Sequence, residues 1–267
     1  RKSKTIDAHF KKQFPKYSSY VIPGYRNPGV TTGRPIAGIA QLSKSDIAVR
    51  KDRVMIDSKR IQGQVLNFVS TRLLWINAYL PTDPQTPDFD ENELLAVLAD
   101  IEKVLDNTEY DDVLISGDMN WDMSRQSGFA LTVRRFLERL NLCSVWENHP
   151  VDFTDIHTDN KAVSTLDHFI CNSRLLQSVT DSGVCHFGDN PSRHSPIMLK
   201  LNLGSLPLKI KSYPVRQKRP AWYKASEQQM SQYSDILMQK LESVPVPDCL
   251  QCRDVKCDSV AHSDNRD

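Results

Sequence analysis

The sequence predicts an α/β fold in which strands pack with two amphipathic helices. Residues 64–80, QVLNFVSTRLLWINAYL, have the β-branched and aromatic enrichment of strands. Residues 88–106 and 127–140 instead repeat apolar side chains at helical spacing. Several expected strands follow one another without an intervening helix, whereas a doubly wound sheet would alternate more strictly. The pattern therefore favours an α/β sandwich.

The expected elements run from residue 36 to residue 203. The first is a strand at 36–42, and the stretch 64–80 is expected to form a hairpin that turns near Ser70–Arg72. The remaining elements are the two helices and strands at 112–116, 142–146, 166–171, 181–187 and 196–203.

The character of the chain changes after residue 204. Residues 205–267 are first basic and Pro-rich, then form one polar helix at about 221–243, and end in a Cys-containing tail. We therefore expect one domain at 1–204 and an appendage at 205–267. The chain starts at Arg1 without a methionine, which we interpret as a fragment or a processed piece.

Charge and composition restrict the classes of partner. The net charge is +1, so affinity for nucleic acid has to come from local basic patches such as residues 1–16 and 207–220. Ordinary solvated surface explains these two patches equally well. No apolar run is long enough to span a bilayer, and no signal-peptide pattern is present.

Cysteine usage indicates the compartment. Cys143, Cys171 and Cys185 are scattered singly in apolar surroundings, as is typical of reduced thiols. We expect an intracellular protein, in the nucleus or the cytoplasm, that is not secreted and has no membrane partner.

A carboxylate and a carboxamide follow the strand 112–116 in SGDMN. On extended backbone, side chains two positions apart point the same way, so Asp118 and Asn120 are expected to face one cleft at the strand's C-terminal edge. An Asp there can bind a hard cation or orient a water, and an Asn can hold a phosphate oxygen. A tight turn that uses Gly, Asp and Asn for backbone reasons alone is the alternative.

The segment STLDHFI (164–170) places Asp167 and His168 side by side at the start of a strand. Adjacent residues on a strand point to opposite faces, so Asp167 needs another partner, and His194 in SRHSPI is the candidate. A carboxylate bonded to an imidazole fixes its tautomer and raises its basicity. We expect His168 to be packed or exposed without a functional role.

Six motifs occur in a fixed order: GRPIAGIAQL (33–42), INAYLP (76–81), GDMN (117–120), DFT (152–154), STLDHFI and SRHSPI (192–197). Over about residues 20–203 the chain resembles the endonuclease/exonuclease/phosphatase superfamily, which includes the DNase I-like and abasic-site nucleases. More narrowly, it resembles the endonuclease domain of LINE-type (non-LTR) retrotransposon polyproteins. The segments KRPAWYKAS and CLQCRDVKC resemble the linker that precedes a reverse transcriptase in such polyproteins.

The resemblance implies a DNase I-like four-layer α/β sandwich, N-terminally truncated, that nicks DNA with Mg²⁺ or Mn²⁺ and a His–Asp dyad. Asp118 would bind the metal and activate the attacking water, Asn120 would hold the scissile phosphate, and Asp167 would orient His194. Tyr79 would lie next to the phosphate. Three further residues would contact the substrate: Thr154, Ser192 and Arg193. DNA is the expected partner, and RNA would be a partner of the downstream reverse transcriptase.

The sequence departs from the family pattern in two places. The family's metal-binding Glu lies in a Q-E pair on an early strand, preceded by an Asn on the first strand, and neither strand is present. Arg193 stands where the family has the Asp of an SDH pattern, which reverses the charge beside His194. Because hard cations need several anionic or carbonyl oxygens, we expect weak metal binding and weak or no activity. The alternatives are a noncatalytic nucleic-acid-binding remnant and a phosphatase of the same superfamily.

The tail carries a possible zinc site, with the spacing C-x₂-C-x₄-C-x₄-H. Four such N/S ligands with a close CxxC pair suit tetrahedral Zn²⁺: Cys249, Cys252, Cys257 and His262. A zinc knuckle this short usually contains Gly and aromatic residues, which are absent here. A linker without zinc is therefore favoured.

Overall fold

The computed structural model describes residues 2–26, 32, 37–83, 91–157, 161–205 and 226–242. The chain divides into two compact units, Arg1–Leu208 and Lys209–Asp267, close to the expected boundary near residue 204. The first unit contains all the described strands, and the described part of the second is the helix α5 (Glu227–Glu242). The four candidate zinc ligands lie outside the described residues: Cys249, Cys252, Cys257 and His262.

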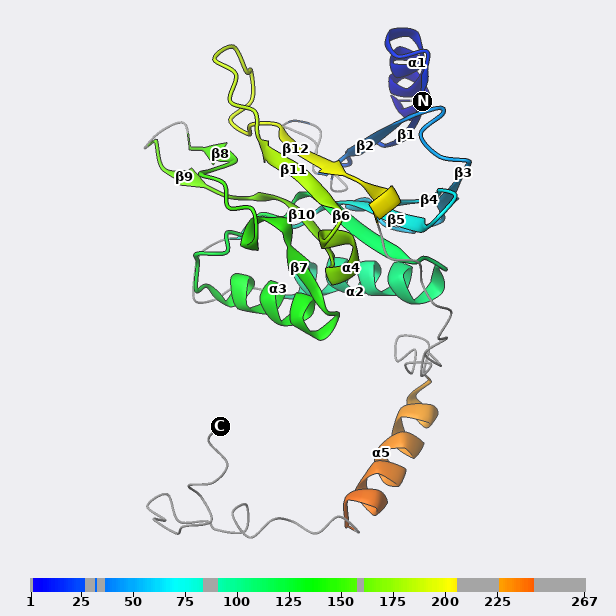
Figure 1. The fold of residues 1–267 in the computed structure, drawn as a ribbon. Coiled ribbons are helices and arrows are strands. Elements are labelled where there is room, and N and C mark those ends of the chain that lie inside the picture. Colours follow the sequence, from blue (N-terminus) through cyan, green and yellow to red (C-terminus); the bar gives the residue numbers. More distant parts are fainter. Residues whose placement is uncertain are drawn as a thin grey trace. The chain divides into compact units, whose positions relative to one another are not determined.

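A mixed sheet of six strands forms the centre of the first unit (Figure 1). Its strand order is β3 (Arg50–Val54), β4 (Ile61–Asn67), β5 (Arg72–Tyr79), β6 (Asp112–Asp118), β10 (Asp167–Asn172) and β7 (Leu142–Ser144). β5 and β6 are parallel, whereas the other neighbours are antiparallel. The chain between β5 and β6 includes the helix α2 (Asn92–Asn107), since parallel neighbours need a long connection.

The helices α2 and α3 (Gly128–Arg139) cover one face of this sheet (Figure 1). Their apolar side chains recur at helical spacing and form the larger core with every second residue of the central strands. α3 begins after Ser127, whose hydroxyl oxygen accepts a hydrogen bond from the amide of Ala130 at 3.1 Å. The other face of the sheet is thereby left for a second layer.

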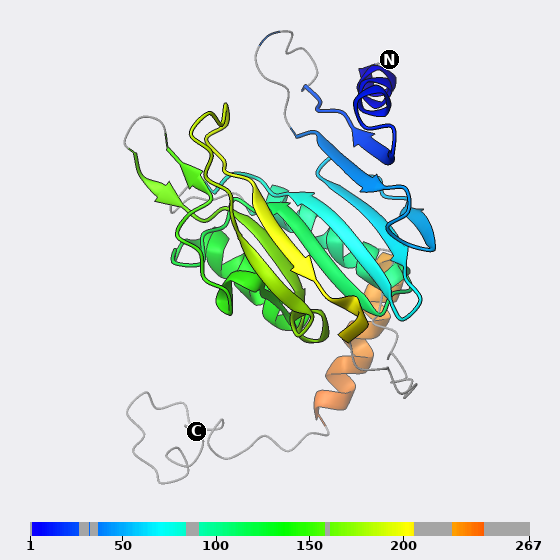
Figure 2. The same ribbon diagram turned by 45° about the horizontal axis from the view of Figure 1, so that its top comes forward.

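Two antiparallel hairpins form that second layer (Figure 2). They are β1 (Tyr17–Ile22) with β2 (Ile39–Lys44), and β11 (Val179–Val184) with β12 (Ile197–Leu201). A smaller core under β11–β12 contains Leu114, Trp146 and Leu175. The expected α/β fold with sheets flanked by helices is confirmed, and the second layer consists of two separate hairpins.

Several short elements complete the first unit. They are the antiparallel pair β8 (Asp155–Ile156) and β9 (Val163–Ser164), and the short helices η1 (Val145–Glu147), α4 (Ser173–Leu176) and η2 (Leu203–Ser205). The strand expected at 142–146 ends at Ser144, because Ser144 and Glu147 form a capping box that starts η1.

Among the longer described elements, three are not indicated by the sequence pattern. The basic segment at the N-terminus forms α1 (Lys2–Gln13), and the polar segments YSSYVI and RKDRV form β1 and β3. β1 and β3 lack a regular alternation of apolar and polar residues, so periodicity alone does not detect them.

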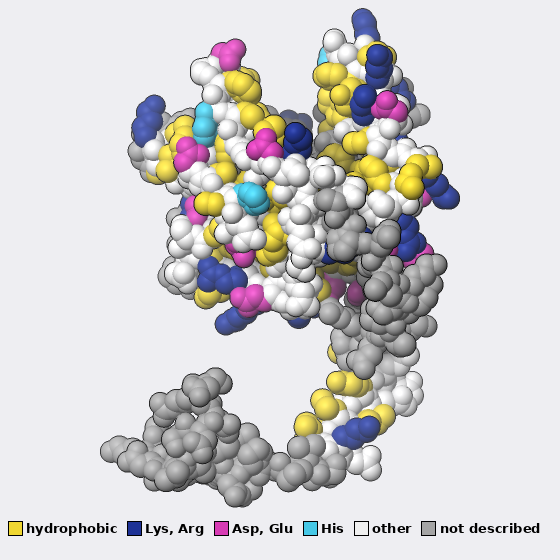
Figure 3. Space-filling model, in the orientation of Figure 1, with side chains coloured by type: hydrophobic (Ala, Val, Ile, Leu, Met, Phe, Trp, Pro, Cys, Tyr) yellow, Lys and Arg dark blue, Asp and Glu magenta, His cyan; other side chains and the backbone are white. Residues whose placement is uncertain are grey.

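The helix α5 of the second unit exposes a set of apolar side chains (Figure 3): Met230, Tyr233, Ile236, Met238 and Leu241. Among the described helices, none is both long enough and apolar enough to cross a membrane.

Gly117 permits the close approach of β6 to β5. Its φ is 134°, and a Cβ at this position would lie 2.1 Å from the carbonyl oxygen of Ala78. We expect Gly117→Ala to lower the free energy of unfolding by about 3 kcal/mol, through backbone strain and this clash. Urea denaturation measures the change. Gly128→Ala is the matched control, because a Cβ there meets no atom within 4 Å, and equal unfolding midpoints would contradict the expectation.

Candidate active site

Tyr79, Asp118 and Asp167 lie in one row across three neighbouring strands. In the sheet register, Asp118 on β6 is opposite Tyr79 on β5 and opposite Asp167 on β10. Side chains alternate along each strand, so all three belong to the face that carries Leu114, under the hairpins. The row is at the end of β6 where the strand gives way to a loop.

His194, in the loop before β12, joins this row through Asp167. Its Nδ1 lies 2.8 Å from Oδ2 of Asp167. This hydrogen bond raises the pKa of His194 above its usual range, against the opposing effect of burial. The fold thus brings together the two residues that the motifs pair, while their catalytic roles remain predictions.

The carboxyl group of Asp118 lies close to the charged carboxylate of Asp167. Burial, followed by this charge, raises the pKa of Asp118 to about 6, although its Oδ1 accepts a hydrogen bond from the amide of Asn120 at 3.0 Å. Ligand atoms of Asp118, Asp167 and His194 all lie within 4.8 Å of one another. Two carboxylates and one imidazole suit Mg²⁺ or Mn²⁺ better than a metal that prefers thiolates.

Asn120 reaches the site through a turn. β6 ends at Asp118, and Asn120 has a φ of 47° in the left-handed region. Its buried side chain donates from Nδ2 to the carbonyl oxygen of Leu80 at 2.9 Å. The expectation that Asp118 and Asn120 share a face of an extended strand is therefore wrong. Both residues still lie together, because the turn returns the backbone amide of Asn120 to the carboxylate.

Thr154 connects the two halves of the dyad. It is fully buried, and its Oγ1 accepts hydrogen bonds from the amides of Leu166 at 2.9 Å and Asp167 at 3.0 Å. Its carbonyl oxygen accepts a hydrogen bond of 2.7 Å from the amide of Ser195, the residue after His194. Thr154 thus fixes the backbone on both sides of the dyad. A contact between Thr154 and the DNA backbone stays a prediction.

Arg193 is held by a carboxylate that the motifs do not indicate. Its Nε lies 2.9 Å from Oδ1 of Asp155, which is 4% exposed. The same oxygen lies 3.4 Å from Nε2 of His194. Asp155 therefore balances the charge that Arg193 brings beside the histidine. The two segments meet through a β-bridge between Asp155 and His194, and no local sequence pattern signals this pairing.

Other residues of the site have mainly local contacts. The hydroxyl oxygen of Ser192 accepts a hydrogen bond of 3.1 Å from the amide of His194, within the loop that precedes β12. The guanidinium of Arg60 lies 5.2 Å from the centre of the Tyr79 ring. His168 is fully buried on the opposite face, where its Nδ1 lies 3.0 Å from Oγ of Ser144 and burial lowers its pKa. His168 is thus a packed residue of the core.

Comparison with known proteins identifies the fold. No family model and no curated protein matches the sequence. Among solved structures, the chain is similar to the 3′ phosphatase NExo from Neisseria bound to a product DNA hairpin (TM-score 0.54, 13% identity, 73% of this chain and 82% of that one). It is also similar to the AP endonuclease LMAP from Leishmania major (TM-score 0.54, 14% identity, 74% of each chain).

A third similar structure is an endonuclease/exonuclease/phosphatase family protein from Leptotrichia buccalis (TM-score 0.51, 16% identity, 74% of this chain and 76% of that one). The chain therefore has the DNase I-like fold of these proteins.

The raised pKa of Asp118 predicts how stability depends on pH. Folded Asp118 holds its proton up to about pH 6, against a value of 3.8 for the free side chain, so the free energy of unfolding falls as the pH rises through this window. We expect Asp118→Asn to be more stable than the parent chain by roughly 2 kcal/mol at pH 8 and to lose this advantage at pH 4.

Urea denaturation in EDTA at the two pH values measures the difference. Asp181→Asn removes an exposed carboxylate from β11 and is the control that should show no such pH dependence. A stability difference for Asp118→Asn that is equal at pH 4 and pH 8 would contradict the expectation.

The ion pair between Asp155 and Arg193 predicts non-additive substitutions. Arg193→Gln leaves a buried carboxylate without its cation and should cost about 1–3 kcal/mol of unfolding free energy at pH 7. The double variant Asp155→Asn/Arg193→Gln should lose less than Arg193→Gln alone. Urea denaturation of the single and double variants tests this, with the exposed Lys200→Gln on β12 as a control. Additive losses would argue against the ion pair.

Proposed function

We propose that the first unit is a nuclease domain that hydrolyses phosphodiester bonds in DNA with the help of a divalent cation. The observation that carries the proposal is the 2.8 Å hydrogen bond between His194 and Asp167, directly across the sheet from Asp118. Structures of the same fold include a phosphatase bound to DNA and an AP endonuclease, which supports a nucleic-acid substrate.

Each residue of the row has a role in this proposal. With a pKa of about 6, Asp118 is largely ionised at neutral pH and can accept a proton from the attacking water. The hydrogen bond to Asp167 raises the pKa of His194, which favours the charged imidazolium, and this form donates from Nε2 to a phosphate oxygen and stabilises the charge that develops there. Asn120 and Tyr79 would orient the same phosphate.

Asp118 and Asp167 carry the oxygens that would hold Mg²⁺ or Mn²⁺, and a bound cation would polarise the phosphate. Two carboxylates are fewer than a hard cation prefers, so we expect weak metal binding and slow hydrolysis. In its reacting position, His194 exchanges its neighbour Asp155 for the phosphate.

We further infer that the domain comes from a LINE-type retrotransposon polyprotein and that RNA is a partner of the reverse transcriptase downstream. The support is the order of the six motifs and the segment KRPAWYKAS that follows them. A phosphatase of the same superfamily is the second candidate, favoured by the likeness to the 3′ phosphatase NExo. A substrate panel of plasmid DNA and 3′-phosphorylated oligonucleotides separates the two.

Plasmid nicking tests the proposed reaction. Because metal binding is expected to be weak, the assay contains Mg²⁺ or Mn²⁺ at a concentration on the order of 10 mM. Under these conditions the chain should convert supercoiled plasmid to open circles. His194→Ala should slow this conversion roughly 10²–10⁴-fold, as expected for the loss of a proton donor. His9→Ala, an exposed histidine on α1, is the matched control and should keep the parent rate.

The outcome distinguishes the alternatives. Binding of DNA that weakens steeply with salt, without any cleavage, would replace the proposal with the noncatalytic one. Nicking that is equally fast in His194→Ala would assign the activity to a contaminant.

A further inference from the structure

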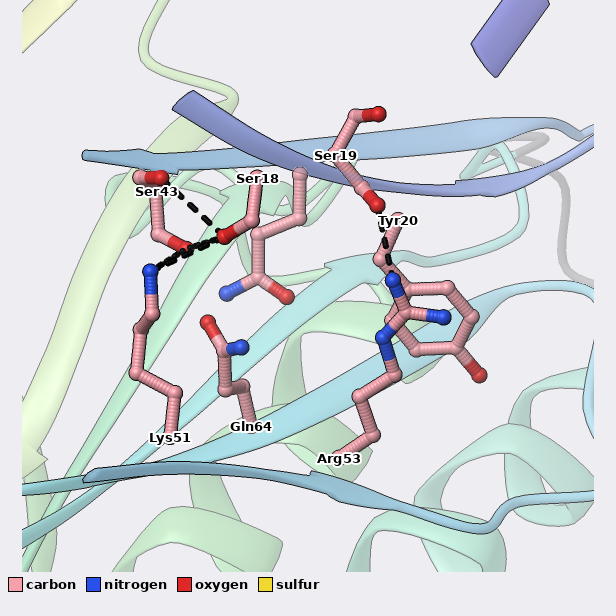
Figure 4. Close-up of a pocket in the computed structure, with 8 residues that line it drawn as sticks. Ser18, Ser19, Tyr20, Ser43, Lys51, Arg53 and Gln64 are labelled. Carbon is pink, nitrogen blue, oxygen red and sulfur yellow. Dashed lines mark hydrogen bonds between the residues drawn. The ribbon is translucent and has the colours of Figure 1, made fainter. Parts of the chain in front are cut away.

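A polar cavity of about 160 Å³ lies between the β1–β2 hairpin and the edge of the six-stranded sheet (Figure 4). The space between packed sheets is normally filled by interdigitating apolar side chains. Here the lining comes from four strands and, apart from Tyr20, consists of residues with polar or charged side chains: Ser18, Ser19, Gln41, Ser43, Lys51, Arg53 and Gln64. The cavity shares none of its lining residues with the row of Tyr79, Asp118 and Asp167.

Two cations enter this cavity from β3. Lys51 and Arg53 are two positions apart on the strand, so they point to the same face, as Figure 4 shows. Nζ of Lys51 donates to Oγ of Ser18 at 2.9 Å, and Nη2 of Arg53 donates to the carbonyl oxygen of Ser19 at 2.8 Å. These partners are neutral, so both positive charges remain.

Carboxylates do not neutralise the pair. Within the described part of the chain, neither Lys51 nor Arg53 forms an ion pair within 4.0 Å. Asp7 acts on Arg53 only at longer range, and its own carboxylate is engaged by Lys11 at 2.9 Å and by the hydroxyl of Ser19. The cavity therefore has a net positive charge that an anion would balance.

A buried amide in the same cavity lacks partners. Gln41 is 4% exposed, and both its Nε2 and its Oε1 are without a hydrogen-bond partner among the described residues. A buried polar group left unpaired is costly, so such groups normally meet a protein atom, a water or a ligand. A molecule that satisfies Gln41 has to accept one hydrogen bond and donate another.

We propose that this cavity binds inorganic phosphate in its hydrogen phosphate form. Phosphate oxygens would meet the charges of Lys51 and Arg53 and accept from Nε2 of Gln41. The P–OH of hydrogen phosphate would donate to Oε1 of Gln41, a bond that sulfate and chloride cannot supply at neutral pH. The volume of about 160 Å³ is below the roughly 300 Å³ at which pockets accept drug-sized ligands, so a phosphate group fits and a whole nucleotide does not.

Thermal unfolding in the presence of anions tests the proposal. Sodium phosphate at ten times its dissociation constant should raise the Tm of the full chain by roughly 3–6 °C at pH 7.5. Sodium sulfate at matched ionic strength should raise it less. The phosphate-specific rise should persist in His194→Ala, which excludes binding at the dyad.

Three variants locate the effect. Lys51→Gln should abolish the phosphate-specific rise, whereas Lys44→Gln should retain it, because Lys44 is on the same hairpin but pairs with Asp46 at 3.4 Å. Gln41→Leu should raise the Tm without phosphate, because it removes the unpaired amide, and should remove the response to phosphate.

Two results would overturn the proposal. One is an equal response of the parent chain to phosphate and sulfate. The other is a phosphate-specific rise that survives in Gln41→Leu. This variant keeps the test decisive even where Lys51→Gln fails to fold, and an NMR titration supplies an independent readout. The side-chain amide signal of Gln41, assigned by its loss in Gln41→Leu, should shift with phosphate, and an unmoved signal would contradict the proposed contact.

Discussion

The antiparallel register of β6 and β10 places the carboxylates of Asp118 and Asp167 directly opposite each other, on a partly buried face of the sheet. Like charges in such a cross-strand pair repel, so the site depends on how this repulsion is offset. One part of the answer is His194, which binds Asp167 and whose pKa is raised by this hydrogen bond, so that its charged form is favoured. The other part is the raised pKa of Asp118, which lets this carboxyl take up a proton as the pH falls to about 6.

The same balance of charges explains how the site accommodates Arg193 beside His194. A cation next to the candidate metal ligands Asp118 and Asp167 would oppose the binding of a second cation. Asp155 offsets this charge through its ion pair with Arg193, so that the loop keeps its histidine beside Asp167. Thr154 and the bridge between Asp155 and His194 then fix the loop against the sheet. The site is thus a set of compensated charges, and a phosphate with its cation would enter by exchanging partners within this set.

The sequence predicts the parts of the molecule that have strong local patterns. The helices α2 and α3 follow from apolar periodicity, and the β4–β5 hairpin follows from β-branched and aromatic enrichment. Asp118, Asp167 and His194 follow from motifs at or near strand ends. Asp155 could not be found in this way, because it reaches His194 only through a long-range bridge. The sequence predicts an extended backbone for Asn120, whereas its left-handed conformation depends on a turn in which its side chain donates to the carbonyl oxygen of Leu80. The sequence pattern does not indicate β3, because its cations face a cavity and leave no apolar alternation along the strand.

The central claim is that His194 and Asp167 act as one unit in hydrolysis, and a double-mutant cycle of cleavage rates tests it most directly. The rates of the parent chain, His194→Ala, Asp167→Asn and the double variant are measured on one labelled DNA duplex with Mn²⁺. If Asp167 works through His194, the double variant is no slower than His194→Ala. Losses that multiply, or a parent chain that leaves the duplex intact, would contradict the account.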